Sequence, residues 1–415
     1  MKLCYFNLLS QIGGAERSLL TMLAAVREAD ADASLHLICG SEGPLCDEAR
    51  KIGVDVTIVD MGQRATGIGD SQATGTLGKA VTLIRLMLAI PAYRAGLRRL
   101  RACLNALAPD LIHSNNLKTH LMLAQCKYAG APIVWHLHDY ISNRSLIRRL
   151  LQRQTRSASH ALAVSESVKQ DWSRVMPDLA IGALYNAVDI KRFSPQAVDG
   201  SFLDRLATTS TGRPVPATLS DPIRIGLVAT YAKWKGHDIF IQAAARLPER
   251  LGNRNVLFYI VGGPIYATAG SQWSARELSA QITAAGLDQR MRLVPFQADT
   301  ADVYRALDVV VHASTRPEPF GLTIVEAMAC GKAVISAAAG GAAELVENEV
   351  SAMTVAPGDI DALSVALARL AGDGSLRERL GGQAVQAVRM RFSPTHLGRA
   401  LSSLYKGLIA RHVRK

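Results

Sequence analysis

The 415-residue sequence lacks the features that mark several common protein classes. It has no apolar run of about eighteen residues, because Arg85 and Pro91 interrupt the best candidate at 80–93, so we expect no membrane-spanning helix. The apolar run at its start is too short for a secretion signal. Its six cysteines show no C-x-x-C or other ligand spacing, which indicates reduced core thiols in a cytosolic protein.

Two further binding patterns are missing. Neither Gly13-Gly14 nor Gly262-Gly263-Pro264 completes the G-x-G-x-x-G fingerprint, so nicotinamide binding is disfavoured. No helix-turn-helix, zinc-finger or RNP-type pattern accompanies the basic residues, so we expect no specific nucleic-acid partner.

Aromatic residues make up only 5% of the chain, whereas 49% of its residues are hydrophobic. This composition and length favour two domains in which helices pack on parallel strands. Short apolar segments alternate with helical stretches, the pattern of βαβ units. We expect strands near 2–8, 33–39, 54–59, 110–113, 132–137 and 160–164 in the first half, and near 223–229, 255–261, 291–295, 308–312 and 333–336 in the second.

The segment 194–222 loses this periodicity and is rich in proline, serine and threonine, which indicates a linker. We therefore predict a first domain at 1–193, a second at 223–392 and a terminal helical segment at 393–415. The predicted fold class is α/β, with two doubly wound domains facing a cleft.

The net charge of +12 is concentrated in one segment, because 79–156 contains thirteen Lys or Arg and only two Asp. One helical set beside a leucine stripe is Arg94, Arg98, Arg101 and Asn105, and a second basic run includes Arg148 and Arg149. Two main interpretations stay open, and non-specific binding of nucleic acid, which basicity alone supports, is a third. The residues form a solvated helix face with the leucines in the core, or they attract an anionic membrane surface or a lipid-linked acceptor.

The most informative stretch is 316–331, a proline-rich loop that leads from an apolar strand into a short helix. Ligands bind at the carboxyl ends of parallel strands, so this loop is a candidate site. Backbone N–H groups around Phe320, Gly321 and Leu322 would begin the helix and suit a diphosphate. Glu326, on the first turns, would accept hydrogen bonds from a ribose diol.

Glu318 and Glu326 enclose seven residues and resemble the E-x7-E signature of retaining, two-domain (GT-B) glycosyltransferases of the group 1, glycogen-synthase-like family. Further segments resemble the family in matching order, namely Gly13-Gly14-Ala15-Glu16, Tyr185-Asn186-Ala187-Val188-Asp189, Lys235-Gly236-His237, Ala333-Val334-Ile335-Ser336, Gly340-Gly341 and Glu344. The resemblance implies two Rossmann-like domains, the first for the acceptor and the second for a nucleotide sugar. It also implies that the terminal helix crosses back onto the first domain.

The resemblance assigns roles to individual residues. His138 would contact the transferred sugar, Lys235 would offset charge on the departing diphosphate, and Glu318 would face the reacting sugar. The expected donor-binding residues are Gly14, Thr230, Lys235, Phe320, Gly321, Leu322 and Glu326. Thr230 departs from the family pattern, because an arginine is usual there, and Lys233 is a candidate substitute.

Some of these residues also fit other functions. His136 and His138 share one face of a strand and could both be structural, or ligate zinc, but no third ligand is nearby in sequence. Paired carboxylates also suggest a hydrolase, yet eight helical residues span on the order of 12 Å, beyond the roughly 5–10 Å that hydrolases use. A structural role for Glu326 is disfavoured, because the sequence shows no partner for a buried charge.

The sequence therefore predicts a retaining hexosyltransferase that uses a nucleoside-diphosphate sugar and a glycan or lipid-linked hydroxyl acceptor in cell-envelope synthesis. We expect no cofactor and no metal, since no suitable D-x-D motif is present. The expected location is cytoplasmic, with the inner face of the cell membrane as a peripheral site. The alternatives are a sugar-nucleotide epimerase of the same fold and a non-catalytic protein that binds a membrane surface.

Overall fold

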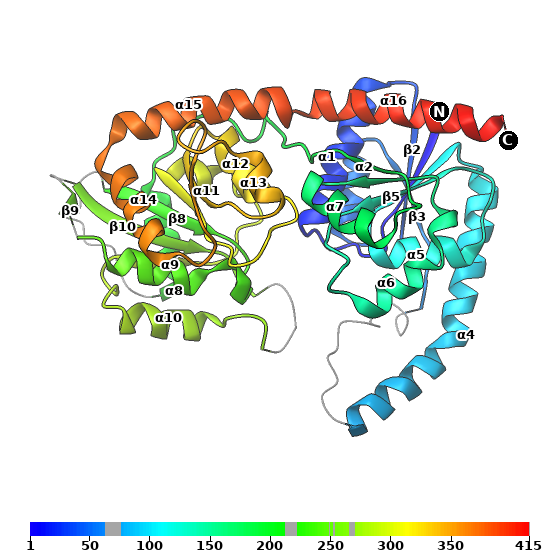
Figure 1. Cartoon of the computed structure of the whole chain (residues 1–415), viewed down its shortest axis with the longest axis horizontal. Coiled ribbons are helices and arrows are strands. Elements are labelled where there is room, and N and C mark those ends of the chain that lie inside the picture. Colours follow the sequence, from blue (N-terminus) through cyan, green and yellow to red (C-terminus); the bar gives the residue numbers. More distant parts are fainter. Residues whose placement is uncertain (63–75, 212–221, 249, 252–253, 265–269, 415) are drawn as a thin grey trace. The chain divides into compact units, whose positions relative to one another are not determined.

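The computed structural model describes residues 1–62, 76–211, 222–248, 250–251, 254–264 and 270–414 (Figure 1). The chain divides into two compact units. The first unit contains Met1–Ala187 and Pro394–Lys415, and the second contains Val188–Ser393. Each unit is built on a sheet with helices on both of its faces, which confirms the predicted α/β class with two Rossmann-like domains.

The first unit contains a seven-stranded, entirely parallel sheet in the order β3-β2-β1-β4-β5-β6-β7. Its strands are β1 (Lys2–Phe6), β2 (Ser34–Cys39), β3 (Asp55–Ile58), β4 (Leu111–Ser114), β5 (Ile133–Leu137), β6 (His160–Ala163) and β7 (Ile181–Ala183). The helices are α1 (Gly14–Ala29), α2 (Pro44–Lys51), α4 (Thr76–Leu107), α5 (Leu117–Cys126), α6 (Ser145–Gln152), α7 (Glu166–Val175) and α16 (Pro394–Val413). A 3₁₀ turn, η1 (Thr155–Ser157), precedes β6.

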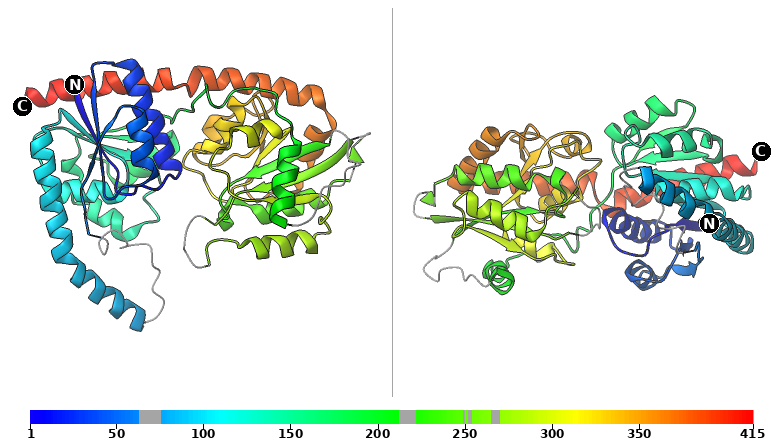
Figure 2. Two further views of the ribbon diagram at one scale, coloured as in Figure 1. Left: turned by 180° about the vertical axis from the view of Figure 1, so that it is seen from behind. Right: turned by 90° about the horizontal axis from the view of Figure 1, so that it is seen from below.

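The terminal helix α16 belongs to the first unit, where it packs against α1 (Figure 2). Leu401 and Tyr405 of α16 share one apolar core with side chains of α1, α2 and the sheet. The packing is close at Gly398, because a Cβ atom there would lie 2.2 Å from the carbonyl oxygen of Ala25. A larger residue at position 398 would therefore force the two helices apart.

The second unit contains a parallel sheet in the order β11-β10-β8-β12-β13-β14, with the short antiparallel strand β9 beside β10. Its strands are β8 (Ile223–Val228), β9 (Arg250–Leu251), β10 (Arg254–Val261), β11 (Met291–Val294), β12 (Val309–His312), β13 (Ala333–Ala337) and β14 (Met353–Val355). The helices are α8 (Ser201–Thr211), α9 (His237–Ala245), α10 (Ala275–Ala284), α11 (Ala301–Ala306), α12 (Leu322–Ala329), α13 (Gly341–Leu345), α14 (Ile360–Gly372) and α15 (Gly374–Arg391), with a 3₁₀ turn, η2 (Lys233–Lys235). Apolar residues of α9, α10 and α14 pack on one face of the sheet.

The boundary between the units lies between Ala187 and Val188, earlier than the predicted end of the first domain at 193. The predicted linker 194–222 differs from the structure in its first half, because 201–211 forms α8, which packs against α11 and β11. Residues 212–221 of that linker lie outside the described part of the chain. The loss of apolar periodicity at 194–222 therefore did not mark the change of unit.

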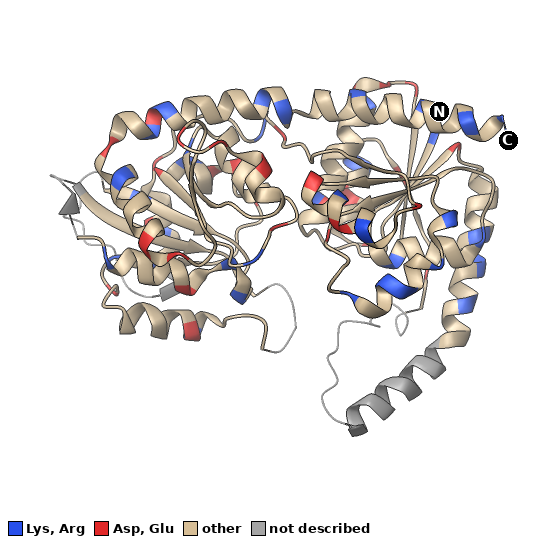
Figure 3. Cartoon of the chain, viewed as in Figure 1, with Lys and Arg blue, Asp and Glu red and all other residues tan. Residues whose placement is uncertain are grey.

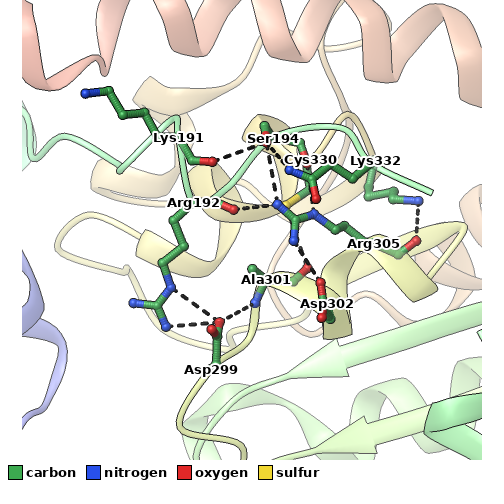
Figure 4. Close-up of polar contacts among 10 residues, drawn as sticks. Lys191, Arg192, Ser194, Asp299, Ala301, Asp302, Arg305, Cys330 and Lys332 are labelled. Atoms are coloured by element: carbon green, nitrogen blue, oxygen red, sulfur yellow. Dashed lines mark hydrogen bonds and ion pairs between the residues drawn. The ribbon is translucent and has the colours of Figure 1, made fainter. Parts of the chain in front are cut away.

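Residues 192–194, just after the boundary, contact the rest of the second unit through arginine side chains (Figure 4). Arg305 of α11 donates to the backbone oxygens of Arg192 and Ser194, and Arg192 pairs with Asp299 at 3.0 Å. Phe193 is buried against the ring of Tyr304. These contacts hold the chain to α11 as it enters the second unit.

Among the described residues, no helix is both long enough and apolar enough to cross a bilayer.

Candidate functional site

The second unit has a topological switch point between β8 and β12, because the chain continues from β8 in one direction and from β12 in the other. Loops that leave neighbouring strands at such a point create a ligand site in doubly wound sheets. The loop after β8 contains Lys235, and the loop after β12 contains Glu318. The two loops touch at Gly236, which has a φ of +73°, and a Cβ atom there would lie 1.9 Å from the carbonyl oxygen of Ala313.

Lys235 and Glu318 form an ion pair at this switch point. The Nζ atom of Lys235 lies 2.8 Å from each carboxylate oxygen of Glu318, and both side chains are largely buried. The same Nζ atom lies 4.1 Å from the ring centroid of Trp234. The structure thus brings together two of the residues that the sequence assigned to catalysis.

The Glu318 carboxylate has further partners on β12 and just beyond it. Ser314 Oγ donates to Glu318 Oε2 at 2.9 Å, and His312 Nε2 lies 3.3 Å from the same oxygen. Burial alone would raise the pKa of Glu318, but the positive charge of Lys235 and the hydrogen bond from His312 hold that pKa well below its usual value. Glu318 is therefore ionised at neutral pH.

The helix α12 begins where the sequence predicted. Gly321 is its N-cap residue with a φ of +110°, and Phe320 before it is buried against Phe392. Within the described part of the chain, the N–H groups of Leu322 and Thr323 have no hydrogen-bond acceptor. They remain available, with the positive end of the helix dipole, for an anion such as a diphosphate.

Glu326 is buried on α12 and accepts a hydrogen bond from the hydroxyl of Tyr304 at 2.9 Å. The sequence interpretation disfavoured a structural role because no partner was visible. That reasoning missed Tyr304, which α11 brings close from 22 positions earlier in the chain. A structural contribution of Glu326 therefore coexists with its expected role in donor binding.

Thr230 follows β8 in the same loop as Lys235. The candidate substitute for the missing arginine, Lys233, has its Nζ atom 4.6 Å from the ring centroid of Trp273. The cation–π contact holds this ammonium group on the indole face. Lys233 would have to leave Trp273 before it could contact a phosphate.

The first unit has its own switch point between β1 and β4. Asn7 follows β1 and Asn115 follows β4, and Asn115 Nδ2 donates to Asn7 Oδ1 at 3.0 Å. The expected glycine turn comes next along the chain, with Gly13 as the N-cap residue and Gly14 as the first residue of α1. Glu16 of α1 accepts a hydrogen bond from the Gly13 N–H group at 3.1 Å.

His138 follows β5, and its Nε2 atom lies 3.0 Å from Asn115 Oδ1. Its ring centroid lies 4.0 Å from that of His136, so the two side chains share one side of the strand, and His136 is in turn 5.1 Å from His113. Burial lowers the pKa of His138 to about 4 and that of His113 to about 3, so both are neutral at pH 7. Among the described residues, no group of three metal-ligating side chains is arranged to hold a metal ion.

Basic residues of the segment 79–156 lie on both α4 and α6 (Figure 3). Arg94, Arg98 and Arg101 are exposed on α4, but Leu100 and Leu104 of the neighbouring leucine stripe are fully buried. Leu100 and Leu104 therefore belong to the core rather than to an apolar surface.

Exposed leucines lie instead on α6, which the sequence interpretation did not single out for them. Leu146 is 71% exposed and Leu150 is 38% exposed, and Arg149 is exposed between them. Arg148 is half-buried and donates to the backbone oxygen of Ser142.

Sequence reasoning found Lys235, Glu318, Glu326 and His138 but missed most of the side chains that position them. Ser314, Tyr304, Asn7 and Asn115 carry no motif of their own, and their roles depend on contacts between loops. One signal was present, because Asn7 and Asn115 each follow an apolar strand directly, where doubly wound folds place ligand-binding residues.

Two family models match the chain. The model described as "Glycosyl transferases group 1" matches residues 211–386, and the model described as "Glycosyltransferase Family 4" matches residues 12–192. The second match ends five residues beyond the boundary between the structural units, the first begins at 211, and residues 1–11, 193–210 and 387–415 lie outside both.

Named relatives are similar at moderate identity. A D-inositol 3-phosphate glycosyltransferase of Saccharomonospora viridis is 29% identical over 339 residues, which cover 77% of this chain and 75% of the relative. The lipopolysaccharide core biosynthesis mannosyltransferase LpcC of Rhizobium leguminosarum bv. viciae is 32% identical over 185 residues, which cover 45% of this chain and 51% of LpcC.

Solved structures resemble the whole chain. Anabaena HepE in complex with UDP is 25% identical with a TM-score of 0.76, and the match covers 98% of this chain and 100% of HepE. A glycosyltransferase from Rickettsia africae has a TM-score of 0.73 at 19% identity, which bears on the fold alone, and the match covers 98% of each chain.

Proposed function

Because this chain belongs to the group 1 glycosyltransferases, with a GT-B fold, we propose that it is a retaining enzyme that transfers a hexosyl unit from a nucleoside-diphosphate sugar to a hydroxyl acceptor. The observation that carries the proposal is the buried Lys235–Glu318 ion pair at the switch point of the second sheet. A cation fixed there suits the developing charge of a departing diphosphate.

The proposed reaction exchanges one bond at the anomeric carbon for another. The acceptor oxygen bonds to that carbon as the bond to the diphosphate oxygen breaks, and the acceptor proton passes to the departing diphosphate on the same face of the sugar. Lys235 and the N–H groups of Leu322 and Thr323 stabilise the negative charge that develops. The ionised Glu318 faces the partial positive charge of the sugar ring.

A uridine nucleotide is the first donor to test, because HepE was solved with UDP and with UDP-glucose. In this proposal Glu326 accepts hydrogen bonds from the ribose, and His138 contacts a hydroxyl of the transferred sugar. Thr230 contributes no charge to the diphosphate site, so donor affinity depends on Lys235 and the start of α12.

A thermal-shift series with UDP-, GDP- and ADP-sugars tests donor binding, because a ligand that binds only the folded state raises the melting temperature. We expect one nucleotide series to stabilise the wild type. We expect Glu326→Ala to weaken the effect, with Glu347→Ala, a change beyond α13, as a matched control that keeps it. A chain that responds to none of the three series would contradict the proposal.

The exposed face of α6 supports an acceptor that is held at a membrane. Leu146, Arg149, Leu150 and Arg153 are spaced three and four residues apart and therefore lie on one side of the helix. Leucines beside arginines suit the interface of an anionic bilayer, where each basic residue adds about 1 kcal/mol of attraction.

Sedimentation with vesicles of phosphatidylglycerol, compared with phosphatidylcholine, tests this surface. We expect binding to the anionic vesicles only, and we expect the double variant Leu146→Ser, Leu150→Ser to reduce it. Val365→Ser is the matched control, because Val365 is 61% exposed on α14 of the second unit. Equal binding of the double variant and the control would remove α6 from the proposal.

A further inference from the structure

A chain of buried amide groups connects His138 to the start of α1. Asn115 Oδ1 lies 3.0 Å from His138 Nε2, and Asn115 Nδ2 donates to Asn7 Oδ1. Asn7 Nδ2 donates to the backbone oxygen of Leu9 at 2.6 Å and to Glu16 Oε1 at 3.3 Å. Asn7 and Asn115 are fully buried, so each amide must match a donor to an acceptor.

The donor and acceptor roles in this series of hydrogen bonds are fixed at one end, because the groups there can only accept a hydrogen bond. A carbonyl oxygen and a carboxylate offer no proton, so the Asn7 atom that faces Leu9 and Glu16 must be Nδ2. Asn7 Oδ1 therefore faces Asn115, which must present Nδ2 to it. Asn115 Oδ1 is then left to face His138, and an amide oxygen can only accept.

A second anchor gives the same answer independently. Asn116 is the N-cap residue of α5, where its Oδ1 atom accepts from the backbone N–H group of Thr119 at 3.0 Å. The side chain of Asn116 must therefore direct Nδ2 toward Asn7, whose Oδ1 atom it contacts at 3.1 Å. Both anchors make Asn7 Oδ1 the acceptor.

We propose that Asn115 and Asn7 fix the tautomer of His138, with the proton on Nε2 and the lone pair on Nδ1 available to accept a hydrogen bond from a substrate hydroxyl. Within the described residues, Nδ1 makes no hydrogen bond of its own. Burial keeps the imidazole neutral at pH 7, so Nδ1 carries no second proton. The contribution of the substrate hydroxyl rests on the proposed function, whereas the tautomer does not.

This arrangement has a consequence for specificity. A neutral Nδ1 acceptor attracts a group that donates, such as a sugar hydroxyl, and repels an ether oxygen or a phosphate oxygen. Asn115 is therefore a positioning residue, which acts on the substrate only through His138. Glu16, the last acceptor in this series of hydrogen bonds, also accepts a hydrogen bond from the N–H group of Gly13.

The tautomer can be measured directly by long-range ¹H–¹⁵N correlation on the full chain labelled with ¹⁵N-histidine, because protonated and unprotonated ring nitrogens have well-separated shifts. The chain has ten histidines, and His138→Gln identifies the signals of His138. We expect a single tautomer with the proton on Nε2 at pH 7. A proton on Nδ1, or on both nitrogens, would overturn the proposal without need of any variant.

Two serine variants separate the roles of neighbouring asparagines. We expect Asn115→Ser to produce a mixture of tautomers and to lower kcat with UDP-glucose about 10²-fold, the scale of a misplaced catalytic contact. We expect Asn116→Ser, which keeps a residue that caps helices well, to leave the tautomer unchanged. An unchanged tautomer in Asn115→Ser would refute the positioning role.

A wrong tautomer assignment for His138 can be distinguished from a failure of the proposed function. If His138 carries its proton on Nε2 but no nucleotide sugar raises the melting temperature, the proposed function fails and the tautomer assignment stands. If UDP-glucose binds but His138 carries its proton on Nδ1, the proposed function stands and this inference fails.

Discussion

Buried histidines should make the first unit sensitive to mild acid. Burial holds the pKa of six of its histidines, His36, His113, His120, His136, His138 and His160, below the unfolded value of about 6.5. The pKa is lowered to about 3 for His113 and about 4 for His138, and it lies well below the usual value for His120 and His136. Unfolding in this pH window therefore takes up protons, so stability is full above pH 6.5 and is lost as the pH falls toward the folded-state pKa values.

The size of the effect follows from proton linkage. Between pH 7 and pH 5, a histidine with a folded-state pKa of about 4 or lower reduces the free energy of unfolding by about 2 kcal/mol, so His113 and His138 together reduce it by about 4 kcal/mol, and His120 and His136 add to that loss. Such a loss is a large part of the whole stability of many domains, about 5–15 kcal/mol. In the second unit, His237 has a pKa lowered to about 4 by burial, so the same linkage costs that unit about 2 kcal/mol.

The variant His120→Phe isolates one of these protons. The His120 ring stacks on Trp135 with an interplanar angle of 8°, and a phenyl ring keeps that contact. Ser114 Oγ loses its bond to His120 Nδ1 but keeps its bond to Thr119. We therefore expect a folded variant whose loss of stability from pH 7 to pH 5 is smaller than that of the wild type, by at most about 2 kcal/mol, the limit set by one unfolded-state histidine.

Hydrogen exchange in urea, read by mass spectrometry, gives the stability of each unit in the intact chain. Peptides from β4 and β5 report on the first unit, and peptides from β8 and β12 report on the second. His412→Phe is the matched control, because His412 is exposed near the end of α16. Equal pH dependence in His120→Phe, the control and the wild type would refute the linkage argument.

Three further predictions concern the second unit. Lys235→Met should lower kcat/KM for transfer about 10²-fold or more in steady-state assays, because the diphosphate loses a fixed cation, and a near-normal rate would remove Lys235 from the mechanism. Tyr304→Phe should cost about 1–3 kcal/mol in urea unfolding, because a buried carboxylate, that of Glu326, loses a donor; a neutral change would mean that this hydrogen bond contributes nothing. Gly236→Ala should destabilise the unit more than Gly286→Ala, since both glycines have positive φ but only at Gly236 would a Cβ atom strike a backbone oxygen. Equal melting temperatures for these two variants would contradict the close approach of the loops.

The sequence predicted most strands within one or two residues, because a strand buried on both faces is a continuous apolar run between turn signals. It missed β7, β9 and β14, which have only two or three residues each and so carry no pattern. It also took 194–222 for a linker, because the polar stretch around α8 resembles one. Periodicity reports local burial, and it cannot say which unit a short polar helix joins.

The site residues were predictable where a motif names them and unpredictable where contacts define them. Glu318 belongs to a spaced pair of carboxylates, and the loop that carries it follows a recognisable strand. Its partner Ser314 and the partner of Glu326, Tyr304, are ordinary residues until the fold brings them close. A single sequence holds no record of such pairings, because they depend on the tertiary packing of loops on sheet edges.

The two switch points differ in the charge of the side chains that join their loops, and on the proposed function we expect them to bind different parts of the substrates. In the first unit, the loops after β1 and β4 meet through the neutral amides of Asn7 and Asn115. In the second, the loops after β8 and β12 meet through the ion pair of Lys235 and Glu318. Neutral amides and imidazoles discriminate among hydroxyl groups by donor and acceptor geometry but cannot offset a net charge.

A buried lysine does the opposite, because its ammonium group attracts any anion and distinguishes poorly among neutral groups. If the proposed function holds, we therefore expect the diphosphate to bind the second unit, and we expect the first unit to discriminate among neutral sugar hydroxyls. A substitution at either switch point should impair the binding of that unit's ligand alone. Lys235→Met should weaken the thermal shift by free UDP, and Asn115→Ser should leave that shift intact while transfer slows. If Asn115→Ser abolished the shift by free UDP, this division of labour would be wrong.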